Sequence, residues 1–173
     1  AVDVAKPTPR GKHAPALRIV LASNQAVDIT DAATQKKVAV SIVRDMDDVP
    51  SVARLGVDPL DDAFDRAVLD ALLDAAGRAQ IKGVLRDQSV IAGIGNAYSD
   101  EILHAARLSP FAPAAALDVD QRAALMASIT DVLTHALERA LEVSDGAGLK
   151  DDKRAGMAVH GRTGQPCPTC GDV

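Results

Sequence analysis

The chain has 173 residues, of which 47% are hydrophobic and only 2% aromatic, and its formal net charge at pH 7 is −5. This length and apolar content suit one ordinary domain or two small ones and exclude global disorder. The acidic balance argues against a histone-like or ribosomal protein with a wholly basic surface, although it leaves room for a local basic patch. The scarcity of aromatic side chains excludes nucleic-acid binding that depends on many stacked bases.

The sequence has no apolar run long enough to span a bilayer and no charged-then-apolar leader. We therefore expect a soluble, cytosolic protein with no membrane partner. The opening, AVDVAKPTPRGKHAPA, starts with Ala rather than Met and has no clear period, and the chain stops three residues after Cys170. These ends lead us to expect a piece of a longer protein.

Residues 1–48 are predicted to form β-strands. Three short β-leaning runs, LRIVL, AVDIT and KVAVSIV, lie between Leu17 and Val43 and are separated by the turn-forming SNQ and by DAATQK. They predict an antiparallel sheet, either complete or the remnant of a larger one, because three strands alone make a marginal unit. Residues 49–63, which hold two prolines and a glycine, are expected to be a linker.

Residues 64–145 are predicted to be helical. The expected helices are a first one that Asp61 or Asp62 caps and Gly77 closes, a short one from about Arg78 to Asp87, one from about Ala97 to Arg107, and a long one from about Val119 to Val143. Asp118, with Gln121 three residues later, predicts a capping box at the start of the long helix. The glycine-rich tail, residues 146–173, is expected to be a mobile loop that ends in a knuckle.

A glycine-bearing turn, GIGN, comes directly before the third expected helix. Gly93 and Gly95 can take positive φ and leave no Cβ in the way, and Asn96 lies where a helix N-cap is expected. Either the turn is an ordinary bend that Asn96 caps, or it binds a phosphate through its backbone N–H groups, the helix dipole and the Asn96 amide. Arg78 and Lys82, four residues apart, would share a helix face and could contact phosphates of one strand.

The stretch IKGVLRDQSVIAGIGNAYSDEILHAARLSPF resembles the helix–two-turns–helix motif of the formamidopyrimidine-DNA glycosylase and endonuclease VIII family. That motif reads approximately I-K-x-x-L-x-D-Q, then G-(I/V)-G-N-x-Y-x-x-E-x-L, then a closing proline. The chain matches it at Ile81, Lys82, Leu85, Asp87, Gln88, Gly93, Gly95, Asn96, Tyr98, Glu101, Leu103 and Pro110. Downstream, HGRTGQPCPTC is similar to the family's (Y/H)-G-R-x-G-x-P-C-x-x-C, the first half of a four-cysteine zinc finger, and LGVDPL is more weakly similar to its L-G-P-E-P-L linker.

The resemblance implies an α+β fold. Residues 1–48 would be the last strands of an N-terminal β-sandwich, residues 64–145 a helix–two-turns–helix DNA-binding domain, and residues 146–173 a mobile loop and a partial zinc finger. Within this fold the resemblance makes Asn96 a phosphate contact and lets Glu101 orient the turn from beneath.

The resemblance also implies a function. Family members excise oxidised bases from DNA and cut the strand at the abasic site by β-elimination, after bending the duplex and flipping the damaged nucleotide. The expected partner is therefore double-stranded DNA with oxidised bases or abasic sites, bound by a monomer in the bacterial cytosol or nucleoid.

Two departures concern catalysis and base recognition. The family's nucleophile is an N-terminal proline followed by glutamate, whereas this chain begins AVDVAK and its Pro7 and Pro9 are internal. We therefore expect no catalytic residue in this chain and no activity of the chain alone. The family's D-x-R-R-F-G loop corresponds to TDAATQKKVAV, in which Lys36 and Lys37 are either DNA contacts or a solvated strand edge.

The third departure is the zinc site. Cys167 and Cys170 supply two of the four ligands that structural zinc takes, and a second pair would lie beyond Val173. His160 is within reach by sequence, but no fourth ligand is evident. A CxxC can also be a redox pair, yet no thioredoxin-like βαβ precedes it, so half of a zinc finger is favoured. We expect weak zinc binding and a poorly ordered tail from residue 144 onward.

Other polar residues of the tail and helices are assigned by position alone. The extended protein would present Arg162 near the DNA. His104 and His135 lie on expected helices and are interpreted as surface or boundary histidines rather than ligands.

Three functions stay open. The first is part of a DNA glycosylase and abasic-site lyase. The second is a binding module that binds damaged or ordinary duplex DNA without cutting it. The third is an RNA binder, because a small-subunit ribosomal protein has a similar helix–two-turns–helix turn. The acidic net charge and the CxxC count against the third.

Overall fold

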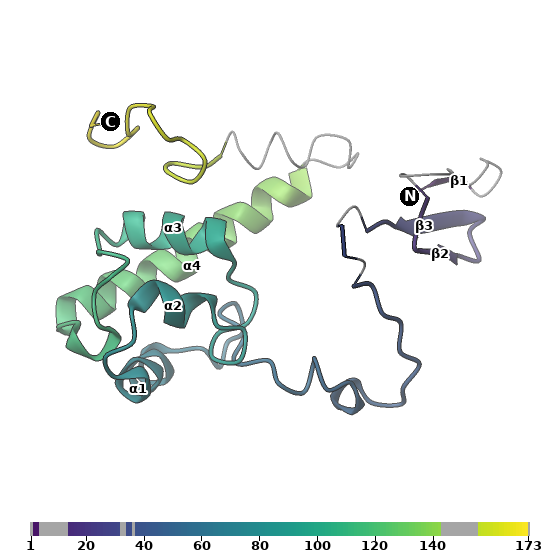
Figure 1. Cartoon of the computed structure of the whole chain (residues 1–173), viewed down its shortest axis with the longest axis horizontal. Helices are drawn as coiled ribbons and strands as arrows, with labels where there is room; N and C mark the ends of the chain where they lie inside the picture. Colours follow the sequence, from purple (N-terminus) through teal and green to yellow (C-terminus); the bar gives the residue numbers. More distant parts are fainter. Residues whose placement is uncertain (1, 4–13, 32–33, 36, 143–155, 173) are drawn as a thin grey trace. The chain divides into compact units, whose positions relative to one another are not determined.

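The computed structural model describes residues 2–3, 14–31, 34–35, 37–142 and 156–172 (Figure 1). The chain divides into two compact units, residues 1–49 and residues 50–173. The first unit holds a small antiparallel sheet and the second holds the α-helices, so the fold is α+β as expected. No helix in the described part of the chain has the length and apolar character that crossing a bilayer requires.

The sheet of the first unit has three strands in the order β1–β3–β2. They are β1 (Val2–Asp3), β2 (Leu17–Val20) and β3 (Gln25–Ile29). β2 and β3 form a hairpin whose turn holds Asn24 at φ 60°, a conformation that asparagine tolerates. Across the hairpin, Arg18 Nε lies 2.6 Å from Asp28 Oδ1 in an ion pair. The first two predicted strands are thus confirmed.

The predicted strand over residues 37–43 is wrong. This stretch belongs to no strand, although its sequence favours the β conformation. β3 lies in the middle of the sheet, paired with β2 on one side and with β1 on the other, and residues 37–43 pair with neither outer strand. The apolar side chains of the stretch are exposed, and Ile42 is 99% exposed. The 3-10 helix η2 (Met46–Asp48) follows, with the Asp45 side chain capping it.

The second unit is built from four α-helices and a short 3-10 helix. They are α1 (Arg66–Ala76), α2 (Ile81–Arg86), α3 (Asn96–Ala105), η3 (Ala114–Ala116) and α4 (Val119–Glu142).

Local capping explains where these helices begin and end. α1 begins later than expected because Asp65, rather than Asp61 or Asp62, accepts the N–H of Val68 at 2.9 Å. Gly77 ends α1 at φ 58°, as predicted. The capping box of α4 is confirmed in both directions: the Gln121 N–H donates to Asp118 Oδ1 at 2.8 Å, and the Asp118 N–H donates to Gln121 Oε1 at 3.0 Å.

One apolar core joins all four helices. Its fully buried side chains are Leu69, Leu73, Ile81, Leu85, Ile91, Ile94, Ile102, Leu125 and Ile129. Burial of one such side chain contributes roughly 1.5–3 kcal/mol, so the core fixes α2 and α3 firmly relative to each other. Two of its members, Ile91 and Ile94, flank Gly93. The glycine turn is therefore anchored in the core on both sides.

Two residues of the expected linker contact the glycine turn. The Gly56 N–H donates to Gln88 O at 2.8 Å, and the Ala92 N–H donates to Val57 O at 2.8 Å. A Cβ at Gly56 would lie 2.3 Å from Val90 O, so only glycine permits this approach. The turn is thus supported from a segment that precedes α1.

Candidate nucleic-acid interface

The glycine turn is held in shape by the side chain of Gln88. Its Nε2 donates to Ile94 O at 2.7 Å and to Arg86 O at 3.1 Å, and its Oε1 accepts the Gly93 N–H at 2.8 Å. These three bonds join the first half of the turn, Gly93 and Ile94, to the end of α2 through one side chain. The sequence analysis matched Gln88 to the motif but did not foresee this role.

Asp87 stabilises the turn that follows α2. Its carboxylate accepts the Ser89 hydroxyl at 2.6 Å and the Ser89 N–H at 2.9 Å, and both bonds hold the pKa of Asp87 below its usual value. The polar side chains of Asp87 and Gln88, which precede the glycines, are thus used internally, and both glycines are exposed.

The two glycines of the turn differ in their roles. Gly93 has φ 84°, in the left-handed region where a side chain is strained, and its N–H is already bound to Gln88. Gly95 has φ −100° and ψ −173°, an extended conformation that any residue can adopt. A Cβ at either position would meet no atom within 4 Å, so open space lies in front of both. Gly93 gives the turn its shape, and Gly95 keeps its outer side clear.

Asn96 is not the N-cap that the sequence predicted. Gly95 is the N-cap of α3, without any side-chain capping bond, and Asn96 is the first helical residue. The Asn96 side chain is exposed and bonds to no residue that the structure describes. The first N–H groups of a helix have no partner within it, and in α3 these include the N–H groups of Asn96 and Ala97. The start of α3 therefore presents hydrogen-bond donors at the positive end of the helix dipole.

Arg78 and Lys82 do not share a helix face, contrary to expectation. α2 begins only at Ile81, so Arg78 lies before the helix, where its side chain is exposed. The Lys82 ammonium lies 2.5 Å from Asp100 Oδ1 on α3, and this ion pair offsets its charge. The two cations are thus not paired on one helix face, and a phosphate contact by either of them stays a prediction from the sequence.

The lysines of the first unit are not placed relative to the glycine turn. Lys37 is exposed, and its backbone N–H donates to Asp31 Oδ2 at 2.8 Å. Lys36 lies outside the described residues. Whether these lysines contact DNA stays a prediction from the sequence.

Glu101 fastens the tail to α3. Its side chain is buried, with 7% exposed, and accepts three consecutive backbone N–H groups: those of Ala158 at 2.6 Å, Val159 at 3.0 Å and His160 at 2.8 Å. A carboxylate that accepts several N–H groups makes strong, charge-assisted bonds. Glu101 was expected to orient the glycine turn, and it instead anchors the tail loop, a role that the sequence analysis missed.

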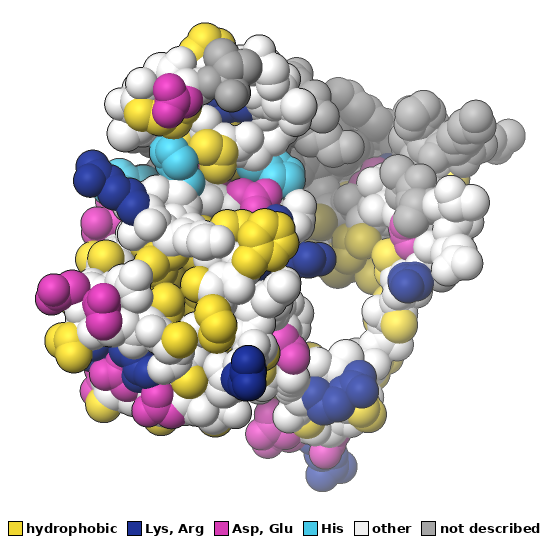
Figure 2. Space-filling view, turned by 60° about the vertical axis from the view of Figure 1, so that its left-hand side comes forward, with side chains coloured by type: hydrophobic (Ala, Val, Ile, Leu, Met, Phe, Trp, Pro, Cys, Tyr) yellow, Lys and Arg dark blue, Asp and Glu magenta, His cyan; other side chains and the backbone are white. Residues whose placement is uncertain are grey.

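Asp100 adds a second connection between α2, α3 and the tail. Besides Lys82 it contacts His160, whose Nδ1 lies 2.9 Å from Asp100 Oδ2. Burial raises the pKa of Asp100, but hydrogen bonds from Lys82 and His160 outweigh that effect, so the pKa lies below its usual value. Figure 2 shows a face on which histidine, acidic and basic side chains are interspersed rather than gathered into one basic patch.

Arg162 follows the anchored segment directly. Its side chain is half-buried, and its Nε is buried without a hydrogen-bond partner among the described residues. Its backbone N–H donates to Val159 O at 3.2 Å, which closes a turn after the Glu101 contacts. The position of Arg162 thus depends on the segment that Glu101 holds.

The two cysteines lie in a tight turn at the end of the described tail. The Cys167 N–H donates to Asp172 O at 2.7 Å, and the Gly171 N–H donates to Cys167 O at 2.8 Å. The N–H groups of Cys170 and Thr169, followed by the His104 imidazole, lower the pKa of Cys167 to about 6. The Cys170 residue is exposed. The Asp172 N–H lowers the pKa of its thiol, but the Cys167 thiol and desolvation raise this pKa by more, so it lies above its usual value.

The described residues do not form the four-thiol zinc site that the resemblance implies. They provide two thiols, and among them no three His, Cys, Asp or Glu side chains form a group that could hold a metal ion. The Nδ1 of His160 contacts Asp100 Oδ2 at 2.9 Å, and His160 belongs to no group of three metal-binding side chains among the described residues. His104 is half-buried, which agrees with its interpretation as a boundary residue, and its Nε2 lies 3.3 Å from Cys167 Sγ. His135 is exposed and contacts Asp131 O on its own helix.

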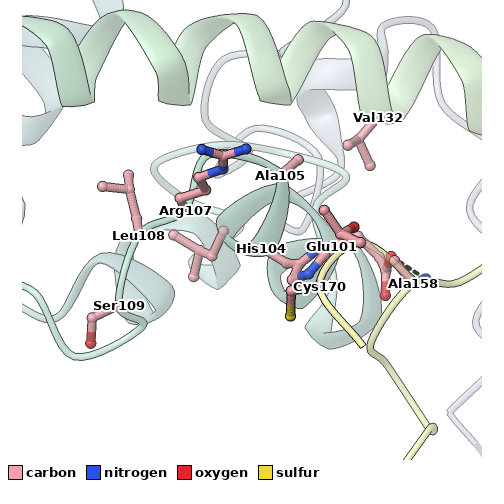
Figure 3. A pocket seen from close by; sticks show the side chains of 11 residues that line it. Glu101, His104, Ala105, Arg107, Leu108, Ser109, Val132, Ala158 and Cys170 are labelled. Carbon is pink, nitrogen blue, oxygen red and sulfur yellow. Dashed lines mark hydrogen bonds between the residues drawn. The ribbon is translucent and has the colours of Figure 1, made fainter. Parts of the chain in front are cut away.

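An open groove of about 780 Å³ separates part of α3 from the tail. Glu101, His104 and Cys170 lie along it, together with Arg107 and Leu108 from the end of α3 (Figure 3). The tail is therefore attached to α3 by the polar contacts of Glu101 and Asp100, and its Met157 side chain is buried.

The helices, the glycine turn and the tail define a helix–two-turns–helix unit followed by a CxxC tail. The family model described as the formamidopyrimidine-DNA glycosylase H2TH domain matches residues 55–145. The chain belongs to the formamidopyrimidine-DNA glycosylase family.

Two curated relatives illustrate how much of the family the chain covers. An uncharacterized formamidopyrimidine-DNA glycosylase-like protein of Mycobacterium tuberculosis is 50% identical over 125 residues, which are 72% of this chain and 76% of that protein. The formamidopyrimidine-DNA glycosylase of Moorella thermoacetica is 37% identical over 155 residues, which are 87% of this chain and 56% of that protein.

Solved structures of the family share the fold. The MutM (Fpg) protein of Thermus thermophilus matches with a TM-score of 0.63 and 36% identity, over 74% of this chain and 50% of that one. The Lactococcus lactis enzyme, bound non-covalently to DNA that contains an abasic site, matches with a TM-score of 0.59 and 27% identity, over 68% of this chain and 43% of that one. The chain thus spans about half the length of these family members.

Proposed function

We propose that this chain supplies the DNA-binding part of a base-excision repair protein, a damaged-base DNA N-glycosylase with β-elimination activity at abasic sites. The observation that carries the proposal is the outward-facing start of α3, where Asn96 is exposed and makes no capping bond. Family membership and the abasic-site DNA bound to the Lactococcus lactis relative support the same partner. The protein is proposed to bind duplex DNA as a monomer in the bacterial cytosol.

The proposed contact is a DNA phosphate beside the damaged nucleotide. The backbone N–H groups of Asn96 and Ala97, the Asn96 side-chain amide and the α3 dipole all favour an anion at this place. Gln88 fixes the turn beforehand, so little conformational freedom is lost on binding. Such a contact recognises no base, so it would bind damaged and ordinary duplex DNA alike.

An alternative is a module that binds damaged or ordinary duplex without cutting it. No residue in the described part of the chain matches the proline nucleophile of the family or the glutamate that follows it. Trapping with borohydride on an abasic duplex separates the two functions. A covalent adduct indicates lyase chemistry within the chain, and binding without an adduct indicates that this chain only holds the DNA.

Substitution of Asn96 tests the proposed contact. Because Asn96 caps nothing, Asn96→Ala is expected to leave the melting temperature unchanged, unlike a true N-cap, whose loss costs about 1 kcal/mol. Duplex affinity, measured by fluorescence anisotropy, is expected to fall roughly tenfold or more, the equivalent of one hydrogen bond to a charged group. Thr130→Ala, on the exposed side of α4, is the matched control. Equal affinities of the two variants would contradict the proposal.

A further inference from the structure

Arg86 is a cation at the end of α2, next to the glycine turn. Its side chain is exposed and makes no ion pair or hydrogen bond with any residue that the structure describes. Its backbone is fixed, because Gln88 Nε2 donates to Arg86 O at 3.1 Å and to Ile94 O at 2.7 Å. The end of α2 and the residue before Gly95 therefore meet at one nitrogen atom.

An ion pair shows how α2 and α3 lie beside each other. Lys82 Nζ on α2 lies 2.5 Å from Asp100 Oδ1 on α3. Residues four apart share a helix face and are separated by about 6 Å along the axis. One helical turn after Lys82 that face carries Arg86, and one helical turn before Asp100 it carries Asn96. Because α2 ends and α3 begins at the glycine turn, both steps lead toward it, and they bring Arg86 to the same level as Asn96.

The other cations of these two helices are placed differently. The Lys82 ammonium faces the Asp100 carboxylate, whereas no carboxylate in the described part of the chain pairs with Arg86. Arg78 lies before α2, at the end away from the glycine turn. Arg107 lies beyond the far end of α3, a helix of 10 residues and about 15 Å. Of the exposed arginines on α2, α3 and their flanks, Arg86 is therefore the one beside the start of α3.

We infer that Arg86 binds the DNA phosphate next to the one proposed for the start of α3. The inference rests on the proposed function and adds a charged contact to the uncharged one at Asn96. A guanidinium can donate two parallel hydrogen bonds to one phosphate. The adjacent Asp87 carboxylate is directed to Ser89, whose hydroxyl it accepts at 2.6 Å, so it leaves Arg86 free for an anion. No existing bond of the Arg86 side chain to a described residue has to break on binding.

The salt dependence of duplex binding tests the inference, with affinities of the full chain measured by fluorescence anisotropy. Each phosphate contact contributes about 0.9 to the slope of log affinity against log salt. Arg86→Gln is therefore expected to reduce this slope by about 0.9 and to lower the affinity about fivefold to tenfold at about 0.1 M salt. Arg107→Gln, which removes the same charge beyond the far end of α3, is the matched control and should keep the slope. Arg86→Lys keeps the charge and should retain most of it.

The loss should be the same for an abasic-site duplex and an intact duplex, because a phosphate contact recognises no base. Equal slopes of the Arg86→Gln and Arg107→Gln variants, or a loss confined to one of the duplexes, would overturn the inference. Asn96→Ala separates this result from the proposed function. If Asn96→Ala weakens binding while Arg86→Gln keeps the parent slope, only the Arg86 contact is refuted. A parent chain that binds no duplex, or an Asn96→Ala variant with the parent affinity, would overturn both.

Discussion

Glu101→Gln tests how the tail is held on α3. In the native chain one carboxylate oxygen accepts the Ala158 N–H, and the other accepts those of Val159 and His160. Glutamine keeps the size of the side chain but replaces one oxygen with an NH2 group, which cannot accept. At least one of the three bonds is therefore lost, and a donor then faces a donor.

The magnitude follows from the kind of bond that is lost. A hydrogen bond to a charged group contributes about 1.5–3 kcal/mol, so docking of residues 157–160 should weaken by roughly tenfold to a hundredfold. Hydrogen exchange measures this as faster exchange of the Ala158, Val159 and His160 amides, while the buried residues of α4 keep their protection. Glu138→Gln on α4 is the control. Unchanged protection of the tail amides in Glu101→Gln would refute the anchoring role.

Three further predictions concern the turn, a cap and the cysteines. Gly93→Ala should lower the free energy of unfolding by about 1–2 kcal/mol, because φ is 84° there, whereas Gly95→Ala at φ −100° should cost less, because it loses only the preference of an N-cap for glycine over alanine. Asp118→Ala should cost about 1 kcal/mol in a denaturant titration, because it removes the α4 capping box. Iodoacetamide should alkylate Cys167 with a rate that rises as the pH rises through about 6, since its thiolate form is favoured above that pH. Cys170 should react only at higher pH, because its pKa is raised; equal rates at pH 7 would contradict this order.

The features that the sequence predicted correctly depend on short-range chemistry. Gly77 ends α1 and the Asp118–Gln121 box starts α4 because each uses bonds within a few residues. The start of α1 was missed because several aspartates precede it. A sequence rule for N-caps cannot tell which of them accepts the N–H of the first helical turn, and in the structure it is Asp65, next to the buried Phe64. Residues 37–43 have a β-leaning sequence, yet they form no strand and their apolar side chains are exposed, because a strand also depends on pairing and packing that the local sequence does not encode.

The site was predicted in outline but not in its contacts. The resemblance located the glycine turn and Asn96, and the turn does face outward at the start of α3. The contacts of Glu101 with the tail and of His104 with Cys167 span 57 to 63 residues, and no local pattern reveals such pairs. Lys82 is predicted as a phosphate contact, and only the folded chain shows that its ammonium also pairs with Asp100.

The central claim is that the start of α3 binds a DNA phosphate, and amide chemical shifts test it most directly. A ¹⁵N-labelled chain is titrated with a duplex that contains an abasic-site analogue. The largest shifts are expected at the backbone amides of Gly95, Asn96 and Ala97 and at the side-chain NH2 of Asn96. A chain that binds the duplex while these resonances stay in place, with the shifts confined to other segments, would contradict the claim.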